Sequence, residues 1–71
     1  MTNTELLEQY IRDSGLKKAK LADALGITYA GLAKKIRGES EFTQGEICGL
    51  RQELELDDHL TSQIFFAPDV S

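Results

Sequence analysis

The residues best suited to do chemistry in this chain are its bases, and they are concentrated in its first half. Residues 1–38 hold seven lysines and arginines against four acids, whereas residues 39–71 hold one arginine against eight acids. The formal net charge of −4 therefore conceals one positive and one negative region. Clustered bases bind anions and an acidic region repels them, although simple solvation of the surface is an alternative explanation of both.

Side chains that could act as nucleophiles or metal ligands are few. Cys48 is the single cysteine and His59 the single histidine. A zinc site needs about four ligands at characteristic spacings, and a catalytic Cys–His pair is only arithmetically possible here. Cys48 is better explained as a small apolar residue of a helix, and Asp57-Asp58 as the start of one. We therefore expect no enzyme activity, no metal, no cofactor and no small-molecule substrate.

The length of 71 residues allows a single domain, residues 1–71. A domain this short buries only roughly 60% of the surface that its unfolded chain exposes, so nearly every apolar residue must join one core. No segment approaches the ~20 consecutive apolar residues that span a bilayer. Residues 1–10 lack the basic region and apolar run of a signal peptide, and a single cysteine forms no internal disulfide. We therefore expect a cytoplasmic protein with no membrane partner.

The spacing of apolar residues predicts five short helices and no strands, and hence an all-α, compact five-helix bundle. Residues 2–5 (Thr-Asn-Thr-Glu) have a capping-box pattern that opens the first helix, and Gly15 fits its end. The second helix is expected from about residue 17 to residue 25, with Gly26 as its stop. The third is expected over residues 28–38, with a threonine cap and a final glycine.

The fourth helix has the clearest start signal. Residues 43–46 (Thr-Gln-Gly-Glu) form a capping box, and Phe42 can pack against Ile47 across it as a hydrophobic staple. Asp57 is expected to cap a last short helix. That helix must end before Pro68, because proline disfavours helical geometry in the residue that precedes it.

The link between the second and third helices is only three residues long, Gly26-Ile27-Thr28. So short a link prevents the helices from running antiparallel, and we expect them to cross at the ~90–120° of a helix-turn-helix. Ala22 offers the small side chain that such a crossing needs, and Gly26 supplies the positive φ of the turn. Ile27 and Leu32 are expected to fill the angle between the two helices.

The segment over residues 15–38, GLKKAKLADALGITYAGLAKKIRG, resembles the helix-turn-helix of lambda-repressor-like (Cro/Xre-type) DNA-binding domains. The matching positions are Leu21, Ala22, Leu25, Gly26, Ile27, Leu32 and Gly38. The stretches SEFTQGEI and IFFAPDV are similar to the small phage-type repressors of that family, so the likeness covers about residues 6–66. It implies a motif over about residues 17–38 whose third helix, the recognition helix, enters the major groove of double-stranded DNA. The function it implies is a sequence-specific transcriptional regulator, a repressor that acts by occupying its operator.

Two positions depart from the family pattern. Lys35 stands where the family usually has an aliphatic residue, and Ile36 follows it, which is the order of the phage-type subgroup. Lys18 stands where many members have a glutamine at the start of the second helix. A phosphate contact survives that exchange, but a side-chain amide network does not.

The residues expected to face the bases are the exposed positions of the third helix. They are Tyr29, Ala30, Gly31, Lys34 and, at the border, Lys35. Lys34 can donate to guanine O6 and N7, and Tyr29 can use its hydroxyl or contact a thymine methyl group. Ala30 and Gly31 carry no hydrogen-bonding side chain and would permit a close approach. For Gly31, a tight crossing with a neighbouring helix is the alternative explanation.

The residues expected to contact phosphates flank that helix. They are Lys17, Lys18, Lys20, Thr28, Arg37, Thr43 and Gln44. Lysines at the start of a helix oppose the helix dipole, and free N–H groups there favour an anion, so a phosphate partner would explain them.

A homodimer on DNA is expected because one short recognition helix contacts few base pairs. Phe65 and Phe66 are adjacent and cannot both face one core, so one of them, with Ile64 and Val70, could form a self-complementary patch. The alternative is that one ring seals the bundle and the other is half exposed. The competing function is a protein-interaction module of the same fold, an antirepressor or antitoxin-like adaptor that uses its acidic surface.

Overall fold

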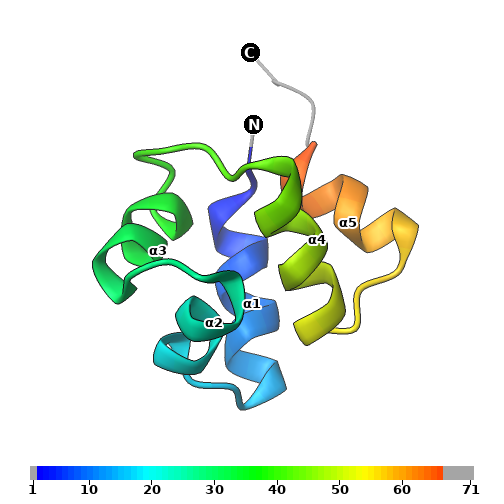
Figure 1. Ribbon diagram of the computed structural model, residues 1–71. Coiled ribbons are helices and arrows are strands. Elements are labelled where there is room, and N and C mark those ends of the chain that lie inside the picture. The colour runs from blue at the N-terminus through cyan, green and yellow to red at the C-terminus, as the bar shows by residue number, and fades with distance from the viewer. Residues whose placement is uncertain (1, 67–71) are drawn as a thin grey trace.

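Five α-helices follow one another along residues 2–66, the part of the chain that the computed structural model describes, and no strand occurs in that range. The helices are α1 (Thr4–Ser14), α2 (Lys18–Leu25), α3 (Tyr29–Ile36), α4 (Gln44–Glu53) and α5 (Asp58–Phe65). Figure 1 shows α2 and α3 to one side of α1, and α4 and α5 to the other. The radius of gyration of 11.1 Å matches the ~11 Å of a compact chain of this length. The predicted all-α, compact five-helix arrangement is confirmed.

The start of α1 differs from the prediction. Asn3 is its N-cap, with an extended backbone, and its Oδ1 accepts from the N–H of Leu6 at 3.2 Å. The capping box predicted over residues 2–5 is therefore wrong by one position. Asparagine is at least as good an N-cap as threonine, so Asn3 takes that role here. Its N–H also donates to the carbonyl of Ile64 at 2.6 Å, and this bond joins the start of the first helix to the last helix.

The other predicted caps are confirmed. Thr28 Oγ1 accepts from the N–H of Gly31 at 3.0 Å, and Asp57 Oδ1 accepts from the N–H of Leu60 at 2.8 Å. Thr43 forms the complete capping box with Glu46. These bonds satisfy N–H groups that have no partner inside a helix.

The end of α2 and the turn after it also follow the prediction. Gly26 is the C-cap of α2 with φ 70°, a left-handed conformation that glycine adopts without steric cost. The N–H of Ile27 donates to the carbonyl of Ala22 at 3.0 Å and closes the turn. α3 begins two residues later, so its direction is fixed relative to that of α2.

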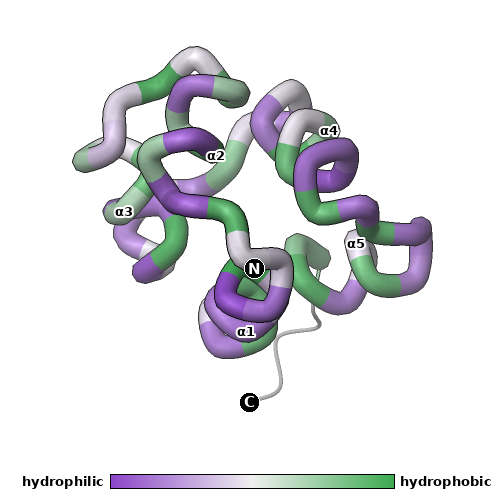
Figure 2. The backbone as a smooth tube through the Cα atoms, turned by 90° about the horizontal axis from the view of Figure 1, so that it is seen from below, coloured by the Kyte–Doolittle hydropathy of each residue, from purple (hydrophilic) through white to green (hydrophobic). Residues whose placement is uncertain are grey.

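One core holds the five helices together. Its most deeply buried side chains come from every helix: Leu7, Leu21, Leu32, Leu50 and Ile64. In Figure 2 each helix carries both hydrophobic and hydrophilic positions, as helices with one buried face must. Phe42 and Phe65 close one end of the core, with ring centroids 5.5 Å apart in an edge-to-face arrangement. Ala22 is buried, as expected where α2 packs against α3.

Gly49 contributes a close approach that the sequence did not reveal. A Cβ atom at this position would overlap Cδ2 of Leu25, so α4 packs against α2 where it carries no side chain. α2 is thus held between α3 and α4. Within residues 2–66, no helix is both long enough and apolar enough to cross a membrane.

Candidate nucleic-acid interface

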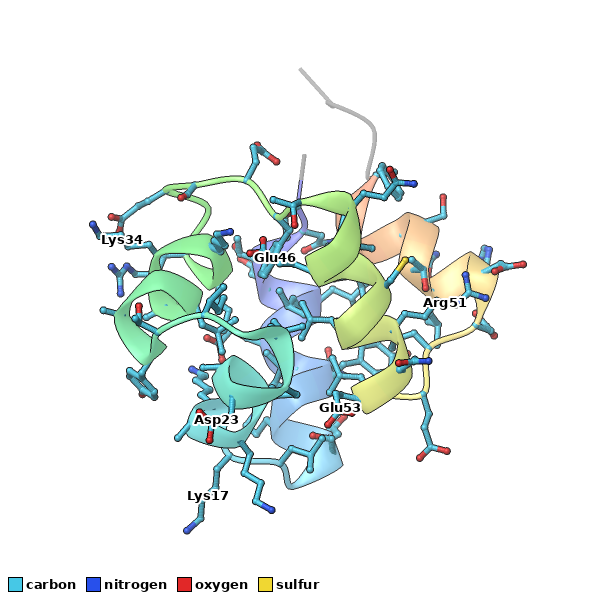
Figure 3. The ribbon with its side chains drawn as sticks, viewed as in Figure 1. Lys17, Asp23, Lys34, Glu46, Arg51 and Glu53 are labelled. Carbon is cyan, nitrogen blue, oxygen red and sulfur yellow. The ribbon has the colours of Figure 1, made fainter. Side chains whose placement is uncertain are left out.

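The outer face of α3 brings together most of the residues predicted to contact bases. Leu32 and Ile36 point into the core, and the 100° step of the helix places Ala30 and Lys34 on the opposite side. Tyr29 falls at nearly the same angle as Ile36, but it is the first residue of α3 and is exposed there. Ala30 and Lys34 are also exposed, and Figure 3 shows Lys34 projecting away from the bundle. The exposed surface of α3 therefore offers one cation on its outer face and one aromatic hydroxyl at its first residue.

Gly31 lies at the edge of this face and contacts no neighbouring helix. A Cβ atom there would meet only Oγ1 of Thr28, at 3.1 Å. The explanation of Gly31 by a tight helix crossing is therefore wrong. Its N–H is the donor in the bond to the Thr28 cap, so the first turn of α3 is held by backbone and cap alone.

Lys35 is placed differently from the other predicted base contacts. Its Nζ lies 2.5 Å from Oε1 of Glu46 on α4, and the two side chains are only 17% and 11% exposed. The N–H of Thr43 donates to the same carboxylate oxygen at 2.9 Å. Burial opposes ionisation of Glu46, but the hydrogen bonds from Lys35 and Thr43 outweigh it and lower the pKa of that carboxyl group. Lys35 thus ties α3 to the start of α4 instead of pointing outward.

The start of α2 carries the lysines predicted to contact phosphates. Lys17 and Lys20 are exposed and form no ion pair with any residue in the range 2–66. Lys18 is partly buried and donates to Glu8 of α1 at 2.9 Å. Lys17 is the N-cap of α2 and supplies no side-chain acceptor, whereas the other four helices have such a cap. The first N–H groups of α2 therefore lack a side-chain acceptor at their cap.

The far end of α3 carries Arg37, another predicted phosphate contact. Its Nε donates to Oε2 of Glu39 at 2.6 Å, and both side chains are more than half exposed, at 57% and 54%. This hydrogen bond and the attraction between the two charges raise the pKa of Arg37 and lower the pKa of Glu39. The chain then runs to α4, where Thr43 and Gln44 are exposed at the helix start (Figure 1).

Carboxylate partners of the bases are the feature that the sequence interpretation missed. Glu8 and Glu46 meet their lysines from other helices, ten and eleven residues away, and no local pattern signals such contacts. Glu39 follows Arg37 by two residues, and that spacing alone could have indicated the pair.

The Phe65-Phe66 pair is divided between core and surface. Phe65 is 4% exposed and Phe66 is 63% exposed. Phe66 lines a pocket of about 480 Å³ together with Phe42, Ile47 and the exposed Cys48. Val70, also predicted for a dimer patch, lies outside the described residues.

Comparison of the chain with protein-family models, with curated proteins and with solved structures gave no match in any of the three.

Proposed function

We propose that this chain is a sequence-specific DNA-binding regulator that inserts α3 into the major groove, with α2 and α3 acting as a helix-turn-helix of the lambda-repressor-like kind. We infer that it represses transcription by occupying its operator. One observation carries the proposal. Four of the eight bases form no ion pair with residues 2–66, and all four lie on α1, α3 and the start of α2 in a chain of net charge −4. They are Arg12, Lys17, Lys20 and Lys34.

The proposed base readers are Lys34 and Tyr29. A lysine on the outer face of a recognition helix can donate to guanine O6 and N7, and a tyrosine can contact a thymine methyl group or donate its hydroxyl. Ala30 and Gly31 would let the backbone of α3 approach the base edges. The absence of any helix against Gly31 supports this role over one in packing.

The proposed phosphate grip begins at α2. Backbone N–H groups without a side-chain cap attract an anion, and Lys17 and Lys20 add positive charge at the same place. Lys18 can also contact a phosphate only if its ammonium group is shared between that phosphate and Glu8. We assign Lys35 to the packing of α3 on α4, and not to base contact, because its ammonium group is largely buried against Glu46.

The experiment that tests this proposal is selection of binding sites from random duplex DNA, followed by titration of the selected site and of random DNA. Lys34→Ala should weaken binding to the selected site by ~1–3 kcal/mol and binding to random DNA much less. Lys20→Ala should weaken binding to both alike. Failure of the wild-type protein to bind any duplex at about 50 mM salt would overturn the proposal, since phosphate contacts are strongest at low salt.

The same proposal includes a twofold dimer on DNA. One α3 helix with two residues that lack hydrogen-bonding side chains reads few base pairs, and a second copy about one helical turn away would add the missing discrimination. Phe66 is the residue we propose for the dimer contact, because it is the exposed ring beside the α4–α5 pocket. Footprinting should reveal two half-sites ~34 Å apart, and Phe66→Ser should separate them into weak single sites. A single short footprint with one protein per duplex would exclude the dimer.

A further inference from the structure

Within residues 2–66, half of the eight bases are paired with carboxylates of the same chain. The four ion pairs are Lys18–Glu8, Lys35–Glu46, Arg37–Glu39 and Arg51–Asp58. The first two join different helices and are partly or largely buried, so they belong to the packing of the bundle. The fourth joins α4 to the start of α5, and Figure 3 shows Arg51 on the side of the molecule opposite to Lys34. Only Arg37–Glu39 is both exposed and attached to the end of α3.

The backbone fixes Glu39 beside this helix. Gly38 has φ 81° and turns the chain back at the end of α3, and the N–H of Glu39 then donates to the carbonyl of Lys34 at 2.9 Å. The backbone of Glu39 is therefore fixed at the end of α3, and its carboxylate lies on Arg37 and within range of the charge of Lys34. The hydrogen bond and charge of Arg37, with a smaller contribution from the charge of Lys34, lower the pKa of Glu39, so the group is ionised at neutral pH.

We infer that Glu39 competes with the DNA backbone for Arg37 and thereby limits the affinity of the protein for DNA of any sequence. This inference rests on the proposed function. When the protein binds, the guanidinium group of Arg37 exchanges the carboxylate of Glu39 for a phosphate. The phosphate releases its counterion, but the freed carboxylate recruits a cation from solution. The exchange therefore gains little from counterion release, and Glu39 opposes a phosphate contact that Arg37 would otherwise make freely.

A matched pair of variants tests this competition. Glu39→Gln and Asp58→Asn each remove one negative charge and each release one exposed arginine, but only the first lies beside α3. Binding of both variants and of the wild type to a random-sequence duplex is measured across a series of salt concentrations. Glu39→Gln should bind about two- to fivefold more tightly at low salt, the range of an exposed ion pair. Its slope of log affinity against log salt should steepen by up to about one, because the release of one further counterion is no longer opposed. Asp58→Asn should stay close to the wild type.

A third variant separates competition from simple repulsion. In an Arg37→Gln background, Glu39→Gln should change neither the affinity nor the slope by more than Asp58→Asn does, because no arginine is left to release. Equal effects of Glu39→Gln and Asp58→Asn, or a full effect in the Arg37→Gln background, would overturn the inference while leaving DNA binding in place. Absence of binding in every variant would instead overturn the proposed function on which the inference rests.

Discussion

On each side of α1 lies a pair of helices, and in each pair the first helix is followed by a residue in the left-handed conformation (Figure 1). The two pairs differ in the type of that residue. After α2, the left-handed residue is Gly26, with φ 70°; after α4, it is Glu55, with φ 53°. Residues 18–36 hold four lysines and one acid, whereas residues 44–65 hold five acids and one arginine, which is paired with Asp58. The α2–α3 pair therefore combines an unstrained turn with two exposed lysines, Lys20 and Lys34, that form no ion pair with residues 2–66. The α4–α5 pair combines a strained turn with a surface of acids. The unstrained turn thus lies beside the proposed DNA contact, and the strained turn lies in the other helix pair.

The largest expected effect comes from substitutions in the core that both helix pairs share. Leu32 of α3 and Leu50 of α4 are both fully buried. Leu32→Ala and Leu50→Ala should each lower the free energy of unfolding by about 2–5 kcal/mol, because each leaves a cavity in the same core. Urea unfolding followed by circular dichroism should remain a single transition in both variants. Two separate transitions, or loss of half the helical signal, would mean that the helix pairs fold independently.

The next largest effect is expected from substitution of the left-handed glycine in the turn between α2 and α3. Gly26→Ala should cost about 1–2 kcal/mol of unfolding free energy, since an L-residue is strained in the left-handed region. A Cβ atom at this position would meet nothing within 4 Å, so the whole cost is one of backbone conformation. The matched control is Gly45→Ala in α4, which also points into open space but at an ordinary helical φ. That variant should be stabilised by up to about 1 kcal/mol. Equal changes in the two variants would contradict this account of the turn.

The third effect concerns the ion pair that links the two helix pairs, Lys35–Glu46. The pKa of Glu46 in the folded protein lies below its ordinary value of 4.5, so the unfolded chain binds more protons between those two values. The contribution of Glu46 to stability is therefore complete above about pH 4.5 and is lost as the pH falls through the folded pKa. Glu46→Gln should cost about 1 kcal/mol at pH 7, because it removes the ion pair with Lys35 but leaves an amide oxygen that can still accept from the N–H of Thr43.

Unfolding free energies measured at several pH values would test this window. The difference between the wild type and Glu46→Gln should shrink as the pH falls below 4. Glu41→Gln removes the same charge from an exposed loop position and should stay near the wild type at every pH. A difference for Glu46→Gln that is constant with pH would mean that the charge of Glu46 is not the source of its contribution to stability.

Local signals in the sequence were sufficient for the helices and for most of their ends. Thr28, Thr43 and Asp57 cap helices because the acceptor and its N–H donor are three residues apart, a relation that can be read from the sequence alone. The start of α1 follows the same relation, because Asn3 Oδ1 accepts from the N–H of Leu6. The prediction placed the cap one residue too early, and the further bond from the N–H of Asn3 to the carbonyl of Ile64 could not be read from local sequence.

The residues of the candidate interface also differ in whether their positions can be predicted from local sequence. Exposure of Lys34 follows from helical periodicity once the buried face of α3 is known. Exposure of Tyr29 does not, because periodicity places it beside Ile36 and only its position at the first residue of α3 leaves it in solvent. The position of Lys35 does not follow from periodicity, because its partner Glu46 reaches it from another helix. Lys34 and Lys35 therefore have the same predicted role, because the sequence shows the bases but not the acids with which they pair.

The smallest expected effect addresses the strained turn between α4 and α5. Glu55→Gly should raise the free energy of unfolding by about 0.5–1 kcal/mol, because glycine relieves the strain at φ 53° although it also increases the entropy of the unfolded chain. Glu55 is exposed, so no packing is lost. Glu55→Ala is the matched control: it removes the same charge, keeps the Cβ atom and should bring no such gain. Glu53→Gly, at the last residue of α4, should instead destabilise the protein by up to about 1 kcal/mol. Stabilisation by alanine as great as that by glycine would show that removal of a charge, and not of strain, is responsible, and the contrast between the two turns would then lose its basis.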